Sequence, residues 1–404
     1  MGYPYKFTTL LAIAGLASTT TLLPSRAANA LSSKVSSAVE SRLTADNLPV
    51  VAASVPEPAP AQILAQRDRD DLSEEQTARL SELLGDARKK IDSGDYGGAI
   101  ALYQQAIQVD GNNARIYSGI AYLQVQQGNF QAAAEYYRQA LDRDPRNLPF
   151  HYGLAHSLFM DERYDQSAEA YIDLIDISPR AADAYIGLGG SLLRLENYDE
   201  AREAYERAVS ISPDNAQAYE AIGLLYLSQG DYDAAIRPLE RALSLDANRS
   251  SVHANLARIW LEQGNESRAF ESLQRAIRLN EFDAEAQFQL GEIYRKRGDE
   301  NAALNHYEQA AESNPGLMPA QAALGELLLA RGQYLRAVLA YRQLIRAFPE
   351  DPGVRYNLGL AQWGQGNERA AIETLEQARR LYETQDNGSG AQRASALLDV
   401  WRNN

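Results

Sequence analysis

A 34-residue pattern repeats nine times, without an insertion or a deletion, from Leu80 to about Gln385. If Leu80 is position 1 of the first repeat, position 8 is Ala or Gly in every repeat, and position 20 is Ala in eight repeats and Ser in one. Position 24 is Tyr in six repeats and Leu in three. Small residues facing a large one allow two helices to cross at close range. A fixed period of this length is typical of proteins that stack one repeat on the next.

Glycine and proline mark where each repeat turns. Position 15 is Gly in seven repeats, and Gly directly after an apolar helical run is typical of a left-handed helix end. The third and fourth repeats carry Glu162 and Glu196 there, which predicts that these two turns are tighter or more strained than the others. Proline at position 32 of five repeats ends the second helix. Each repeat is therefore expected to form two helices, over positions 1–14 and 18–31, that bury their apolar faces only against neighbouring repeats.

Large and small residues recur at fixed spacings inside each repeat. In the fifth repeat they are Tyr219, Ile222, Gly223, Tyr226, Ala235 and Leu239. Because this pattern stays in phase over about three quarters of the chain, the repeats resemble the tetratricopeptide repeat family. The resemblance implies an all-α fold, a right-handed α-solenoid in which antiparallel helix hairpins form a superhelix. It also implies a concave face, lined mainly by positions 2, 5, 9, 12 and 13 of the first helices, that binds proteins or peptides.

Composition narrows the possible partners. The 404 residues contain no cysteine, which excludes disulfides, cysteine zinc sites and thiolate catalysis. The net charge is −15, and a nucleic-acid partner would need a basic stripe. We therefore expect no nucleic-acid partner, and the simplest interpretation of the negative charge is a solvated acidic surface.

The sequence offers no catalytic, cofactor or metal site. The four histidines, at positions 151, 156, 253 and 306, lack the spacing of zinc ligands. The chain has no G-x-S-x-G elbow and no glycine loop that would hold a phosphate. The repeats also leave too little chain for a separate catalytic domain of the glycosyltransferase type. No enzymatic activity, no cofactor and no bound metal are expected.

Residues 1–30 have the features of a secretory signal. An apolar, Thr-rich run extends from Phe7 to Leu23, and Ala28 and Ala30 form an A-x-A cleavage site. We expect export to the periplasm or cell envelope of a bacterium, with a mature chain that begins at Leu31. The alternative is that the apolar run is kept as a membrane anchor, and only in that case would the protein contact a membrane.

Residues 31–72 are rich in Pro and Ala and are expected to form a flexible linker. The linker is either a tether that holds the repeats away from a membrane or partner, or a leader without a role. The repeat array is assigned to residues 73–385. Ser73 and Gln76 have the spacing of a capping box, which predicts a first helix from Glu74.

Residues 386–404 combine a helix breaker with a short apolar helix. The breaker extends from Asp386 to Gly390. The apolar stripe consists of Ala394, Leu397, Leu398 and Trp401. Because the last repeat of a solenoid leaves one apolar side open, this helix is expected to cap the array.

The face that the resemblance implies has an uneven lining. Its candidate partner-binding residues are Tyr122, Tyr152, His156, Phe159, Met160, Ile186, Phe288, Tyr356 and Trp363. The charged residues Glu292, Arg295 and Lys296 accompany the last three. Exposed aromatic side chains beside a methionine are typical of binding hot spots. The alternative is that these side chains pack against neighbouring helices.

These observations predict a non-catalytic scaffold or adaptor that binds a protein or peptide partner along its first helices. A second possibility is an assembly factor that residues 7–23 tether to a membrane.

Overall fold

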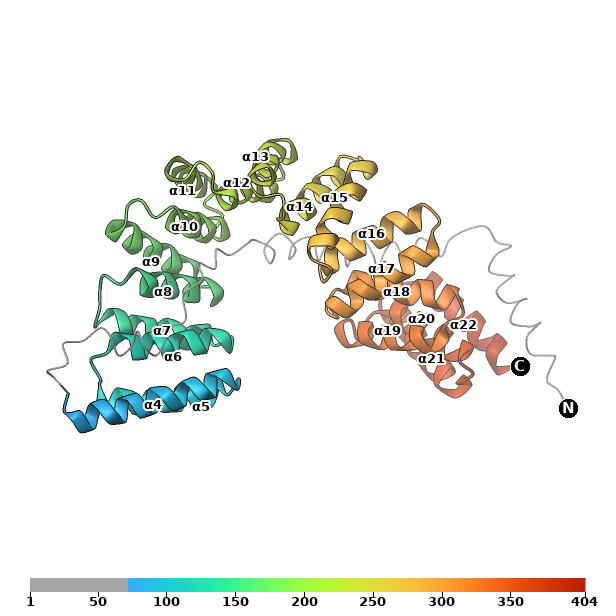
Figure 1. Ribbon diagram of the computed structural model, residues 1–404. Coiled ribbons are helices and arrows are strands. Elements are labelled where there is room, and N and C mark those ends of the chain that lie inside the picture. The colour runs from blue at the N-terminus through green and yellow to red at the C-terminus, as the bar shows by residue number, and fades with distance from the viewer. Residues whose placement is uncertain (1–71, 404) are drawn as a thin grey trace. The chain divides into compact units, whose positions relative to one another are not determined.

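The computed structural model describes residues 72–403, and these residues form helices and turns without a strand. They divide into two compact units, which we call the N-terminal stack (residues 72–248) and the C-terminal stack (residues 249–403). In each stack the helices pair in chain order into antiparallel hairpins, and each hairpin packs on the next (Figure 1). The predicted all-α solenoid of hairpins is confirmed. The predictions made for residues 1–71 fall outside the described residues.

The N-terminal stack contains hairpins 1–5. Its helices are α4 (Glu74–Asp92), α5 (Tyr96–Val109), α6 (Ala114–Gln126), α7 (Phe130–Leu141), α8 (Leu148–Met160), α9 (Tyr164–Ile177), α10 (Ala182–Arg194), α11 (Tyr198–Ile211), α12 (Ala216–Ser228) and α13 (Tyr232–Leu245).

The C-terminal stack contains hairpins 6–9 and one further helix. Its helices are α14 (Ser250–Glu262), α15 (Glu266–Leu279), α16 (Ala284–Lys296), α17 (Glu300–Ser313), α18 (Met318–Ala330), α19 (Tyr334–Ala347), α20 (Pro352–Gly364), α21 (Glu368–Thr384) and α22 (Gly388–Arg402). Among residues 72–403, no helix has both the length and the apolar composition of a membrane span.

The predicted caps and turns form at the expected residues, although the first helices end at position 13 and the second helices begin at position 17, one residue before the predicted bounds of 14 and 18. Ser73 and Gln76 make both hydrogen bonds of the capping box, and α4 starts at Glu74. All seven glycines at position 15 have positive φ. Glu162 and Glu196 take the same left-handed conformation with φ of 60° and 61°. For a residue with a Cβ this conformation costs about 1–2 kcal/mol, so the expected strain at these two turns is confirmed.

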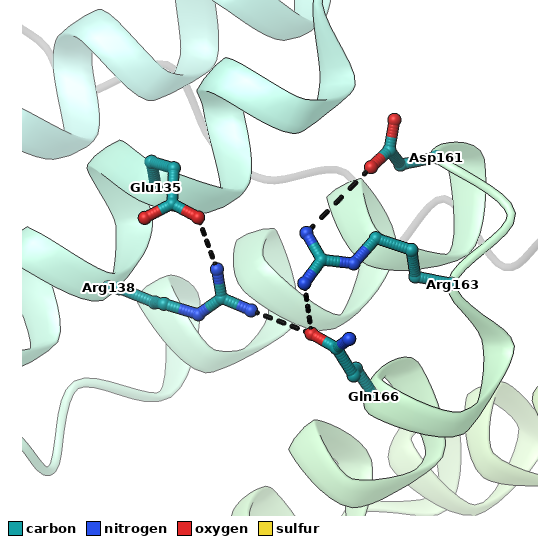
Figure 2. Close-up of polar contacts among 5 residues, drawn as sticks. All are labelled: Glu135, Arg138, Asp161, Arg163 and Gln166. Atoms are coloured by element: carbon teal, nitrogen blue, oxygen red, sulfur yellow. Dashed lines mark hydrogen bonds and ion pairs between the residues drawn. The ribbon is translucent and has the colours of Figure 1, made fainter.

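A polar network lies beside the Glu162 turn (Figure 2). The side-chain oxygen of Gln166 in α9 accepts hydrogen bonds from Arg163 and, at 3.0 Å, from Arg138 of α7. The other members are Glu135, 2.6 Å from Arg138, and Asp161, 3.9 Å from Arg163. Because Asp161 and Arg163 flank Glu162, the network connects this strained turn to the preceding hairpin.

The tyrosine at position 24 occupies one of two seats, which differ in the glycine that its ring covers. In hairpins 1–3 the ring covers a glycine at position 6 of the next hairpin, and a Cβ on Gly187, for example, would overlap the Tyr171 ring. In hairpins 4, 7 and 8 the ring covers the glycine at position 8 of its own hairpin, as Tyr307 covers Gly291. We call these the next-hairpin seat (Tyr103–Gly119, Tyr137–Gly153, Tyr171–Gly187) and the own-hairpin seat (Tyr205–Gly189, Tyr307–Gly291, Tyr341–Gly325).

Helix α22 packs on hairpin 9 through stacked indole rings. Trp401 is 4% exposed, and its ring lies parallel to that of Trp363 with the centroids 4.4 Å apart. The helix begins at Gly388, so the predicted breaker is too long by three residues. The reason is that the Asn387 side chain accepts a hydrogen bond from the backbone N–H of Gly390 and caps the helix within the expected breaker.

Candidate functional site

First helices lie next to one another over hairpins 2–5 of the N-terminal stack and over hairpins 8 and 9 of the C-terminal stack. In the N-terminal stack α6 contacts α8, α8 contacts α10 and α10 contacts α12, and in the C-terminal stack α18 contacts α20. Within residues 72–403, no two neighbouring second helices approach as closely. Most residues at positions 2, 5, 9 and 13 of the first helices are partly exposed, and we call the side that they form the first-helix face.

Hairpins 2 and 3 present a row of large side chains on this face. Tyr122, Tyr152 and His156 are half-buried, and Met160 is exposed. Burial raises the pKa of Tyr152 to about 12, the Asp183 charge adds to the increase, and a hydrogen bond from the Ala184 backbone offsets part of it. Burial lowers the pKa of His156, which favours the neutral imidazole. The row therefore offers apolar rings with polar tips, the kind of surface that is enriched at interfaces.

Two candidates of the N-terminal stack lie in the core instead. Ile186 is 2% exposed and belongs to the apolar cluster that contains Tyr205. Phe159 is 8% exposed and meets Tyr164 edge to face, with the ring centroids 5.2 Å apart. Phe159 is at position 12 and Ile186 at position 5 of their first helices, and the spacing alone does not reveal that Tyr164 and the cluster around Tyr205 cover them. Both residues are therefore removed from the candidate partner-binding set.

The candidates of the C-terminal stack also have partners within the chain. Phe288 is half-buried, with its ring 6.0 Å from that of Tyr307. Trp363 stacks on Trp401, so one face of its ring is already covered. Tyr356 is half-buried, and burial raises the pKa of its hydroxyl. Of these three residues, Trp363 changes its role most, because it joins the last helix to the array.

Charged residues occupy position 9 in hairpins 7 and 8. Glu292 accepts hydrogen bonds from both Nε and Nη2 of Arg295, at 3.2 and 2.7 Å, and from the Tyr307 hydroxyl at 2.5 Å. Glu326 is the equivalent residue of the next hairpin and is half-buried. The sequence analysis includes Glu292 and Arg295 but misses Glu326 and the hydroxyl of Tyr341 near it. Position 9, read down the repeats, would have shown the two consecutive glutamates.

The described residues contain no group of three or more His, Asp or Glu side chains placed to hold a metal ion. The half-buried His306 has ordinary structural partners: it lies 2.7 Å from the side-chain oxygen of Gln287 and stacks on Tyr294. Such contacts make His306 part of the packing between helices.

Family models identify the repeats. One tetratricopeptide repeat model matches residues 84–147, 220–284 and 322–399, which is about half of the chain. Three other tetratricopeptide repeat models match residues 124–174, 180–248 and 284–317. The chain therefore belongs to the tetratricopeptide repeat family, whose members generally act as protein-interaction scaffolds. A search of curated protein sequences gave no match.

Solved structures resemble this chain to different degrees. A tetratricopeptide repeat protein of Parabacteroides merdae is 18% identical, with a TM-score of 0.52 over 62% of this chain and 99% of that one. MamA is 29% identical, with a TM-score of 0.37 over 41% of this chain and 96% of that chain. Human IFIT1, solved with m7Gppp-AAAA, is 21% identical, with a TM-score of 0.47 over 71% of this chain and 67% of that chain. The first of these similarities supports the fold.

Proposed function

We propose that this protein is a non-catalytic scaffold of the bacterial cell envelope that binds a segment of a partner protein on its first-helix face. The segment docks as a helix or an extended strand across hairpins 2 and 3, with apolar side chains between the rings of that face. Export follows cleavage after Ala30, and the linker of residues 31–72 separates the repeats from the mature N-terminus.

The row of Tyr122, Tyr152, His156 and Met160 is the observation that supports this proposal. Three of these side chains are half-buried and one is exposed, so each can lose further surface on binding. Aromatic rings have few rotatable bonds and lose little entropy when they are fixed, and methionine adapts to irregular shapes. A solvated helix face has no need for such a row, since charged side chains would keep it soluble at lower cost.

The test is a crosslinked pull-down from envelope fractions with the wild-type chain, followed by quantitative binding of the captured partner. Tyr152→Ala combined with Met160→Ala should weaken binding by about 2–4 kcal/mol, roughly 30- to 1000-fold. Ile172→Ala is the matched control, because Ile172 is 47% exposed but lies on the second helix α9. Binding that is equal in the wild type and the double variant would refute the proposed face.

The N-terminus has its own test. Protein sequencing of the native chain should give Leu31 as the first residue. A native chain that begins at Met1 would favour the second candidate, an assembly factor tethered by the apolar run of residues 7–23.

A further inference from the structure

Glu326 differs from Glu292 in having no partner. Both are position 9 of a first helix in the C-terminal stack, but Glu292 is satisfied by Arg295 and Tyr307. No described residue forms a hydrogen bond or an ion pair with Glu326, although the residue is half-buried. A half-buried carboxylate without a partner is unfavourable unless a cation or a donor from outside the chain completes it.

The hydroxyl of Tyr341 is unsatisfied next to it. Tyr341 is 2% exposed, and its hydroxyl has no hydrogen-bond partner. Its ring lies over Gly325, the residue that precedes Glu326. The charge of Glu326 adds to the effect of burial in raising the pKa of Tyr341, so the two groups are close. The Asn357 side chain lies near the hydroxyl and offsets part of this increase. Hairpin 8 thus has the tyrosine and the glutamate of hairpin 7 without the hydrogen bond between them, and it has Leu329 where hairpin 7 has Arg295.

Among the described residues, Arg295 is the one cation whose charge acts on Glu326, and it is shared with Glu292. Burial raises the pKa of Glu326, and the Glu292 charge raises it further. Arg295 lowers it, but the guanidinium of Arg295 already makes two hydrogen bonds to Glu292. Burial also raises the pKa of Glu285, on the same helix as Glu292. A cation placed at Glu326 would therefore meet uncompensated negative charge.

We propose that the first-helix face of hairpins 7 and 8 binds a basic segment of a partner protein and seats one Lys or Arg side chain on Glu326. The bound cation donates to the Glu326 carboxylate, as Arg295 does to Glu292 one hairpin earlier. The half-buried Phe288 and Tyr356, at position 5 of the adjoining hairpins, offer apolar surface for the aliphatic part of the segment. This inference rests on the proposed function and adds to it the charge of the partner and the anchoring residue.

The test uses a library of random 12-residue peptides selected on the full-length chain. Selected peptides should be enriched in Lys and Arg. Replacement of the common basic residue by norleucine or citrulline should weaken binding about 10- to 100-fold, the effect of removing one charged hydrogen-bond partner. Glu326→Gln should cause a loss of the same size. The matched control is Glu312→Gln, because Glu312 is exposed on the second helix α17 and should leave binding within about twofold.

Two further measurements separate recognition from folding. Glu326→Gln removes a half-buried charge and should melt at or above the temperature of the wild type, so its loss of binding cannot come from unfolding. Combining Glu326→Gln with norleucine or citrulline in the peptide should weaken binding no more than either change alone. Peptides that bind without a basic residue, or equally to wild type and Glu326→Gln, would overturn this inference and leave the proposed function standing. Failure to select any peptide would reject both.

Discussion

The tyrosine at position 24 packs against different helices in hairpins 1–3 and in hairpins 7 and 8. In the first group the ring covers a glycine of the next hairpin, as Tyr171 covers Gly187, so it joins two repeats. In the second group the ring covers a glycine of its own hairpin, as Tyr307 covers Gly291, and it joins two helices of one repeat. One repeat pattern therefore supports two packing schemes, chosen by whether glycine stands at position 6 or at position 8.

The seat decides what the tyrosine hydroxyl meets. In the own-hairpin seat, position 9 directly follows the glycine, and the Tyr307 hydroxyl reaches Glu292 there. In the next-hairpin seat position 9 is Tyr122 or His156 in hairpins 2 and 3, and the first-helix face there is aromatic. In hairpin 7 the buried tyrosine therefore reaches a charged residue of the first-helix face, whereas the same face of hairpins 2 and 3 carries rings at position 9.

The largest expected effect tests the next-hairpin seat. Gly187→Ala places a Cβ within the ring of Tyr171 and should destabilise the chain by about 1–3 kcal/mol, even though Ala is the better helix former. Gly190→Ala is the matched control, because its Cβ would lie no closer than 3.8 Å to Phe159 and 3.9 Å to Tyr205. That control should be more stable than wild type by up to about 1 kcal/mol. Urea unfolding followed by circular dichroism measures both.

A rescue experiment sharpens the result. Leu stands at position 24 in hairpins 5 and 6, and position 6 of the repeat that follows each of them is Asn255 or Gln289 rather than Gly. Tyr171→Leu should therefore recover part of the stability lost in Gly187→Ala. Circular dichroism is the measurement for these variants. The three tryptophans, at positions 260, 363 and 401, all lie in the C-terminal stack, so tryptophan fluorescence reports on that stack alone. Two additive single effects would show that the ring and the glycine are not coupled.

The next effect tests the own-hairpin seat. Tyr307→Phe removes the hydrogen bond to Glu292 and leaves the ring over Gly291, so we expect a loss of about 1–2 kcal/mol in the free energy of unfolding. The unfolding transition should shift in tryptophan fluorescence. Tyr341→Phe provides the comparison, because the hydroxyl that it removes has no partner. Equal losses in the two variants would mean that the Glu292 bond adds nothing.

The fold follows from the sequence more completely than the site does. Glycine and capping residues act locally, so the turns at Gly94 or Glu162 and the start of α4 at Glu74 can be predicted from the residue and its neighbours. The partner-binding candidates depend on which neighbour covers each side chain. Phe159 and Ile186 lie at positions that the family exposes, yet Tyr164 and the Tyr205 cluster bury them.

Sequence spacing also misses pairs that lie between hairpins. The choice between the two seats depends on position 6 of the following repeat, and a pattern that treats each repeat separately does not contain it. In the same way Trp363 occupies an expected face position but stacks on Trp401, a residue beyond the repeats. The part that cannot be predicted is therefore the tertiary contact, which is set by the sizes of two residues distant in sequence.

A smaller effect concerns pH and isolates the charge of Glu326. Its pKa is raised in the folded chain, so its contribution to stability is fully present below its ordinary pKa and is lost as the pH rises through the folded value. Glu326→Gln lacks this loss, and its advantage over wild type should grow as the pH rises above the ordinary glutamate pKa of about 4. Glu312→Gln should show no such slope. The groups that share the site with Glu326 are Glu292, Arg295 and Tyr341, and none of them is changed in either variant.

The smallest effect returns to the next-hairpin seat and asks whether its hydroxyl matters at all. Tyr137 is fully buried over Gly153, and its hydroxyl has no hydrogen-bond partner. Tyr137→Phe removes a hydroxyl whose burial is not compensated by a hydrogen bond. The free energy of unfolding of the variant should therefore equal that of wild type or exceed it by up to about 1 kcal/mol. Urea unfolding by circular dichroism measures the change, with Tyr307→Phe as the variant of opposite sign. A clear loss of stability in Tyr137→Phe would mean that the hydroxyl is satisfied in solution, and the two seats would then differ in geometry but not in the use of the phenol.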